Sequence, residues 1–241
     1  HFIQSKNVQW EKLISLDFGQ SNPNAWYVWI YDSNWVLYIV DEYYKPAIPS
    51  VAAREMFVKF SPYMNTTEEK VLKMDFEKRK ELFYNTFQVA VIDPTTRAKN
   101  RTKIKNWLEQ EFSVIEDFYD NWMDFSPGNN DWDASITRLR EYFQIWENWK
   151  SHIYIFQDKC PNLCWELQHY KYKEQTETQE RTNNNSERPV KKHDHWIDSL
   201  RYMIMTRPNK PVDAPVKKTW AQKDMERFIK PKDISIDWYN D

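Results

Sequence analysis

Two short apolar runs that each end in an aspartate constrain the fold of this 241-residue chain more than any other feature. Residues 12–19 (KLISLDFG) end with Asp17 and Gly19, as a buried strand does when it leaves a sheet through a turn. Residues 87–92 (FQVAVI) are a continuous apolar run, typical of a sheet covered on both faces, and Asp93 follows directly. The sequence therefore predicts two buried strands that each end at a carboxylate.

The rest of the chain alternates between strand-like and helix-like patterns. Residues 25–31 and 35–43 are aromatic and β-branched, so with 12–19 they predict three consecutive antiparallel strands. Helical spacing is predicted over 51–60, with Ser50 as its N-cap, and over 67–84, 103–112, 131–146, 161–170 and 194–205. Further strands are predicted over 113–117 and 152–156.

These elements predict an α/β fold, with a mixed β-sheet flanked by helices. Residues 171–188 are polar and predict a loop or β-hairpin before the last core helix. We expect one domain over 1–206 and an extended, partner-docking or self-docking C-terminal tail over 207–241.

Composition excludes several classes of function. With only two glycines, the chain has no phosphate-binding loop of the ATPase kind. No apolar run is long enough for a signal or membrane helix, so we expect a soluble, intracellular piece of a longer protein that contacts no membrane. The formal charge of -2 means that nucleic-acid binding would need local basic patches. Cys160 and Cys164 lack a second ligand pair and are predicted to be ordinary reduced cysteines.

Asp17, Asp93, Asp194 and Asp198 are all predicted where a strand or helix meets one edge of the sheet. On a helix, Asp194 and Asp198 share a face, and His195 is also a neighbour of Asp198. Clustered aspartates suit Mg²⁺ or Mn²⁺, which prefer oxygen ligands. Two such ions about 4 Å apart could activate a water and stabilise the leaving 3′ oxygen of a phosphodiester. The predicted chemistry is hydrolytic strand scission.

The same acids also have ordinary structural explanations. Aspartates at strand ends and helix starts often cap backbone amides or close turns. Asp194 is best placed to be an N-cap and is therefore the weaker ligand, whereas Asp198 lies inside its helix, where an ion pair with Arg201 is the alternative. Asp17 is the least explained by capping, because the strand ends at it and Gly19 then permits close approach of a backbone or ligand.

The order L-D-F-G, V-A-V-I-D-P and H-D-H-W-I-D-S-L-R-Y resembles the nuclease domain of phage large terminases. I-T-R-L-R from Ile136 and D-K-C-P-N-L-C-W-E-L-Q-H-Y from Asp158 also resemble that family, so the similarity covers roughly residues 12–206. It implies a ribonuclease H-like fold and an endonuclease that cuts concatemeric viral DNA. Its metal-binding acids fall on Asp17, Asp93 and the segment from Asp194 to Asp198.

Two points of that carry-over stay open. Some members of the family have an acid where this chain has His195, and the third ligand is ambiguous between Asp194 and Asp198. The resemblance implies a catalytic set of Asp17, Asp93 and Asp198, with Asp194 and His195 assisting, and two Mg²⁺ or Mn²⁺ ions.

The resemblance also implies partners and a location. These are double-stranded DNA, an N-terminal ATPase domain of the same polypeptide, a portal and a small terminase subunit, in the cytoplasm of an infected bacterial host at the procapsid portal. Basic residues beside the predicted site could contact phosphates: Arg97, Lys99, Arg101, Lys103, Lys105, Lys191 and Lys192. Two other readings are a junction resolvase or transposase-like nuclease, and a non-catalytic DNA-clamping or portal-docking domain.

Overall fold

The computed structural model describes residues 11–31, 36–105, 108–145, 151–170 and 195–206. The chain divides into a unit of residues 1–207 and a unit of residues 208–241, and every described residue belongs to the first. The predicted loop over 171–188 and the predicted tail over 207–241 lie outside the described residues. Among the helices that the structure describes, none combines the length and apolar character that a membrane span requires.

A mixed six-stranded sheet forms the centre of the first unit. The strands β1 (Glu11–Asp17), β2 (Asn24–Tyr31) and β3 (Leu37–Lys45) are antiparallel neighbours, as predicted. The strand β4 (Val89–Ile92) lies parallel to β1, and β7 (Ser126–Pro127) lies parallel to β4. On the other side, β8 (Ile153–Ile155) lies parallel to β3. The order β7-β4-β1-β2-β3-β8, with only β2 reversed, is that of a ribonuclease H-like sheet, which confirms the predicted fold class.

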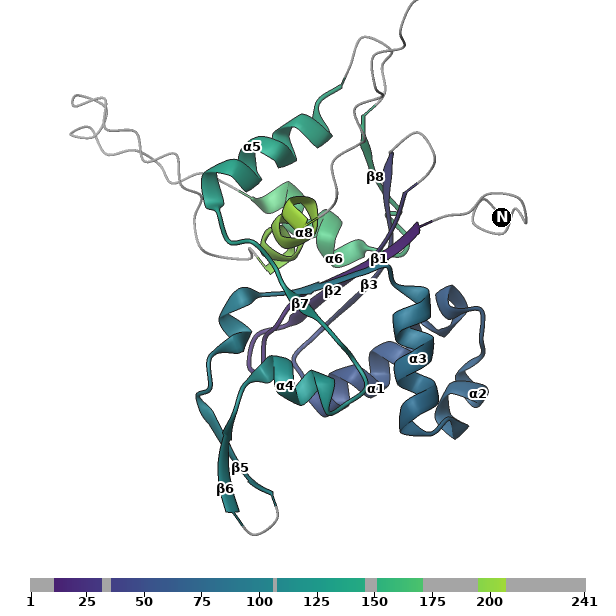
Figure 1. Ribbon diagram of the computed structural model, residues 1–241. Helices are drawn as coiled ribbons and strands as arrows, with labels where there is room; N and C mark the ends of the chain where they lie inside the picture. The colour runs from purple at the N-terminus through teal and green to yellow at the C-terminus, as the bar shows by residue number, and fades with distance from the viewer. Residues whose placement is uncertain (1–10, 32–35, 106–107, 146–150, 171–194, 207–241) are drawn as a thin grey trace, which may run out of the picture. The chain divides into compact units, whose positions relative to one another are not determined.

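Helices cover both faces of this sheet (Figure 1). One face is covered by α1 (Pro49–Lys59), α2 (Glu68–Lys73), α3 (Phe76–Thr86), α4 (Val114–Tyr119) and the 3₁₀ helix η2 (Ser61–Met64). The other face is covered by α5 (Trp132–Phe143), α6 (Pro161–His169) and α8 (His195–Thr206). Because side chains alternate along a strand, Ile14 of β1 packs under α1 whereas Leu13 packs under α8. The two faces therefore have separate cores.

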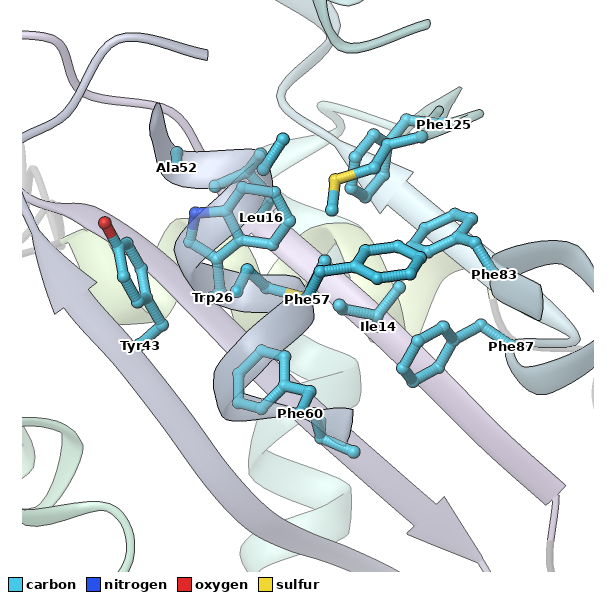
Figure 2. Close-up of a cluster of buried hydrophobic side chains, with 14 of the residues drawn as sticks. Ile14, Leu16, Trp26, Tyr43, Ala52, Phe57, Phe60, Phe83, Phe87 and Phe125 are labelled. Atoms are coloured by element: carbon cyan, nitrogen blue, oxygen red, sulfur yellow. The ribbon is translucent and has the colours of Figure 1, made fainter. Parts of the chain in front are cut away.

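Aromatic rings fill the core on the α1 face (Figure 2). Trp26 of β2 is fully buried and meets Tyr43, Phe118 and Phe125 edge to face, with ring centroids 6.3, 5.4 and 5.5 Å apart. Such pairs each add about 0.5–1.5 kcal/mol beyond the burial of apolar area. This packing fixes β2, and through it β1, against the helical layer.

The region 101–119 differs from the sequence prediction. Residues 103–112, expected to be a helix, belong to a hairpin of β5 (Arg101–Lys105) and β6 (Leu108–Phe112) that is separate from the main sheet. The apolar positions 104, 107 and 108 have helical spacing in the sequence, but residues 101–105 pair antiparallel with residues 108–112. Residues 113–117, expected to be a strand, begin α4, because Ser113 and Glu116 form a reciprocal capping box.

Two helix boundaries were also predicted wrongly. The single helix expected over 67–84 is two helices, since α2 ends at Lys73 and Asp75 caps the start of α3 by accepting from the Lys78 backbone N–H at 2.9 Å. Ser50 is not the N-cap of α1. Pro49 already occupies the first turn, and proline is favoured there because the first N–H groups of a helix have no partner within it.

Candidate active site

The ends of β1 and β4 bring Asp17 and Asp93 to the same edge of the sheet. In the parallel register of these strands Leu16 lies opposite Ile92, and the next residues are the two aspartates. The Asp93 backbone N–H donates to the Leu16 carbonyl at 3.1 Å, which extends the pairing to the point where both strands end. Parallel pairing of two strands that each end in an acid therefore accounts for the meeting of residues 76 positions apart.

Helix α8 lies over this edge and supplies the next two site residues. The hydroxyl oxygens of Ser199 and Ser15 are 2.8 Å apart in the core between α8 and β1. Nδ1 of His195 lies 3.0 Å from Oδ2 of Asp17. Trp196 is buried in this core and does not form an exposed stacking surface.

The surroundings of Asp17 disfavour the ionised form of its carboxyl group. It is 8% exposed, and its pKa is raised from 3.8 to about 6. Burial is the main cause, since it penalises the charged form; the hydrogen bond with His195 lowers the pKa, while the negative charges of Asp198 and Asp93 raise it. The three predicted acids are thus close enough to repel one another.

Asp198 is held by Arg201, one helical turn further along α8. Oδ1 of Asp198 accepts from Nη1 of Arg201 at 2.5 Å, which is the ion pair that the i,i+3 spacing predicts. The Arg201 side chain is buried, donates from Nε to the Ser135 hydroxyl at 2.7 Å, and lies over the Trp132 ring at 4.1 Å. Helix α5 therefore fixes the cation that in turn fixes Asp198.

Asp93 also performs the ordinary capping role. Its Oδ1 accepts from the Thr95 backbone N–H at 2.8 Å and its Oδ2 from the Thr95 hydroxyl at 2.7 Å. These bonds start the 3₁₀ helix η3 (Pro94–Arg97). Capping and metal binding by Asp93 are compatible, because the cap fixes the carboxylate at the edge of the sheet.

The donor set fits a divalent metal ion in its chemistry. Asp17, Asp93 and Asp198 offer only oxygen ligands, which Mg²⁺ and Mn²⁺ prefer, and a bound cation would offset both the burial of the charged Asp17 carboxylate and its repulsion by Asp198 and Asp93. Within the described ranges, no three potential ligands are gathered closely enough to hold one ion as a group. Asp194 lies outside the described residues.

The predicted basic residues have different surroundings. Arg97 is exposed in η3, directly after Asp93, and Lys99 pairs with Glu116 at 3.3 Å. Arg101 donates to the Gln20 side chain at 2.6 Å, and its guanidinium lies 5.4 Å from the centre of the Phe18 ring. The backbone of β5 contains Lys103 and Lys105, whereas Lys191 and Lys192 lie outside the described residues. The hairpin thus begins beside the loop that follows Asp17.

Asn24 is a site residue that sequence reasoning missed. Its side-chain amide donates to the backbone carbonyls of Gly19, Lys45 and Ala47, at 2.9, 3.1 and 3.0 Å, and so closes the loop after Asp17. A Cβ atom on Gly19 would lie 2.4 Å from the Asn22 carbonyl oxygen, so the close backbone approach expected at this glycine is present. An asparagine in a polar turn carries no sequence signal for this role.

Both cysteines are free thiols, as predicted. Cys160 is buried at the start of α6, and burial raises the pKa of its thiol. This keeps it in the unreactive thiol form.

No protein-family model matches the sequence, and the comparison with curated proteins finds no match. Solved structures do match. The chain is similar in structure to phage large terminases. The large terminase of a thermophilic bacteriophage, in complex with ATP-γ-S, is 20% identical, with a TM-score of 0.48, 80% of this chain covered and 39% of that one. The P22 large terminase nuclease domain is 15% identical, with a TM-score of 0.49, 81% of this chain covered and 80% of that one.

This chain therefore spans about two fifths of the length of the thermophilic phage terminase, but most of the length of the P22 nuclease domain.

Proposed function

We propose that this chain is a divalent-metal-dependent endonuclease domain that hydrolyses phosphodiester bonds of double-stranded DNA. The observation that carries the proposal is the convergence of Asp17, Asp93 and Asp198 from two parallel strand ends and one helix. An acid at the edge of a sheet whose pKa is raised by burial and, to a smaller extent, by two neighbouring acids is a costly arrangement that a purely structural role does not require.

Each residue has a role in this proposal. Asp17, Asp93 and Asp198, with Asp194 assisting, would hold two Mg²⁺ or Mn²⁺ ions, which when bound supply an activated water and stabilise the leaving oxygen. His195 orients the Asp17 carboxylate through its 3.0 Å contact. Arg201 holds Asp198 in place through its ion pair.

The basic residues would hold the DNA backbone without reading its sequence. Arg97 and Arg101 flank the turn after Asp93, and Lys103 and Lys105 continue along β5. Lys99 could exchange its partner Glu116 for a phosphate, and Lys191 and Lys192 immediately precede α8 in the sequence. DNA that lay across this edge of the sheet would place a phosphodiester next to the acids.

The cellular role that we propose is cutting concatemeric viral DNA during genome packaging, in the cytoplasm of an infected bacterium. Its supports are the sequence resemblance over roughly residues 12–206 and the ribonuclease H-like sheet. In that role the partners would be an ATPase domain of the same polypeptide, a portal and a small terminase subunit.

The test is nicking and linearisation of supercoiled plasmid with Mn²⁺, Mg²⁺ or EDTA, using wild type, Asp17→Ala and Asp198→Ala. We expect metal-dependent cutting that both substitutions abolish while circular dichroism shows folded protein. Asp124→Ala, at an exposed aspartate outside the site, is the control and should cut normally. Normal cutting by Asp17→Ala would contradict the proposed site, and a preference for four-way junctions would favour a resolvase. Tight DNA binding without cutting would favour a clamping or docking domain.

A further inference from the structure

Glu166 of α6 is a buried carboxylate that reaches the candidate site although it is none of the predicted acids. It is 1% exposed, and its Oε2 accepts a hydrogen bond from the Trp196 backbone N–H at 3.0 Å. Trp196 lies in the first turn of α8, where backbone N–H groups have no partner within the helix. Glu166 therefore caps α8 from a different helix, where a negative charge also meets the positive end of the helix dipole.

The other oxygen of Glu166 is tied to the row of the sheet that contains Asp17. Its Oε1 accepts a hydrogen bond from the Tyr44 hydroxyl. In the sheet register Tyr44 lies opposite Ala25, and Ala25 lies opposite Asp17, so the three side chains leave the same face. Burial raises the pKa of the Tyr44 hydroxyl, as do Glu166 and the nearby Glu42, so this hydroxyl remains a donor.

These contacts form a closed network of hydrogen bonds and sheet pairing. Asp17 contacts the His195 ring, the next residue of α8 donates its backbone N–H to Glu166, and Glu166 is held by Tyr44 in the sheet row of Asp17. The network links β1, β3, α6 and α8 through groups that lie 30 to 178 positions apart in the sequence.

We propose that Glu166 is a positioning residue that sets the first turn of α8, so that His195 reaches Asp17 and Asp198 faces the same edge. As far as metal binding is concerned, the proposal rests on the proposed function. Loss of the carboxylate leaves the Trp196 N–H buried without a partner, and the turn then has to move to find one. His195 precedes that N–H by one residue, so its contact with Asp17 breaks first.

The experiment compares wild type with Glu166→Ala, Glu166→Gln and Tyr44→Phe. The matched control is Asp41→Asn. Asp41 lies in β3 and, like Glu166, is a buried carboxylate. It contacts Lys59 and Tyr63, however, and has no bond to α8 in the described structure. The first readout is the ring nitrogen NMR signal of His195 in metal-free protein, assigned with His195→Gln, with His152 and His169 as internal references.

The expected result is that Glu166→Ala moves the His195 signals and leaves those of His152 and His169 in place. Glu166→Gln should restore the wild-type signals, since its amide oxygen can accept from Trp196 and its amide group can donate to the Tyr44 oxygen. Tyr44→Phe should give an intermediate shift, and Asp41→Asn none.

The second readout is Mn²⁺ affinity, measured by calorimetry without DNA. We expect it to weaken ten-fold or more in Glu166→Ala and to stay within two-fold of wild type in Asp41→Asn. Unchanged His195 signals in a folded Glu166→Ala variant would overturn the proposal; if that variant does not fold, unchanged signals in Tyr44→Phe would do so. A wild type that neither binds Mn²⁺ nor cuts DNA counts against the proposed nuclease instead, while the His195 signals still decide the role of Glu166.

Discussion

Replacing Asp17 with asparagine should stabilise the metal-free protein at neutral pH while abolishing its proposed activity. The pKa of Asp17 rises from 3.8 to about 6 on folding, which is about 2 units, and one unit corresponds to about 1.4 kcal/mol. The folded state therefore binds this proton more tightly than the unfolded state. As pH rises from about 4 to about 6 the wild type loses up to about 3 kcal/mol of stability, and the full cost is present above about pH 6.

The assay is urea unfolding in EDTA, followed by tryptophan fluorescence, at several pH values from about 3 to 8. We expect the free energy of unfolding of Asp17→Asn to match that of the wild type at the acid end and to exceed it by up to about 3 kcal/mol at the alkaline end. Asp124→Asn, at an exposed aspartate, gives the change that the loss of one surface charge causes. A variant that is less stable than the wild type at about pH 8 would refute the reasoning, because it would mean that the charged carboxylate is favourably paired.

Addition of Mn²⁺ should make the wild type more stable than Asp17→Asn. A ligand at a thousand times its dissociation constant stabilises the folded state by about 4.1 kcal/mol, which exceeds the deficit of about 3 kcal/mol, and that gain requires the Asp17 carboxylate. We therefore expect Mn²⁺ to raise the stability of the wild type and to leave Asp17→Asn nearly unchanged. Equal stabilisation of both proteins would place the ion elsewhere.

Three further changes test separate parts of the argument. Arg101→Ala should weaken DNA binding and lower the slope of log K against log salt by about 1, measured by anisotropy with Ca²⁺, whereas Lys80→Ala, on α3, should leave the slope unchanged. Gly19→Ala should cost about 1–3 kcal/mol in urea unfolding and reduce cutting, because its Cβ would meet the Asn22 carbonyl oxygen at 2.4 Å. Ser113→Ala should cost about 1 kcal/mol through loss of the capping box and leave cutting unchanged, since α4 holds none of the acids.

The sequence predicted the sheet well because its strands have strong, local patterns. The run that ends at Asp17 is buried on both faces and the run that ends at Asp93 is buried at its last two residues, so apolar continuity was a sufficient signal. Residues 103–117 were predicted wrongly because the local spacing of apolar residues was the only guide. The pairing of β5 with β6 makes the first part a hairpin, and the Ser113 cap makes the second part a helix.

The supports of the candidate site could not be predicted, because each depends on a partner far away in the chain. Glu166 is placed by Tyr44, 122 positions before it, and Arg201 by Ser135, 66 positions before it. The local sequence around Glu166 and Arg201 does not distinguish them from an ordinary glutamate or arginine on a helix. Asp17 and Asp93 could be found in the sequence because each directly follows an apolar run, and Asp198 because it shares a helix face with Asp194, but their role in metal binding stays a prediction.

The geometry of the site depends on how firmly α8 is attached, since this one helix supplies both His195 and Asp198. The ionised carboxylate of Asp17 costs about 3 kcal/mol, mainly because it is buried and to a smaller extent because Asp198 and Asp93 repel it. Leu200 and Met203 of α8 are fully buried against the sheet, and each contributes about 1.5–3 kcal/mol in the opposite direction. Apolar burial along the helix thus offsets the electrostatic cost at its first turn, and it leaves the direction of that turn to be set by the polar contact with Glu166.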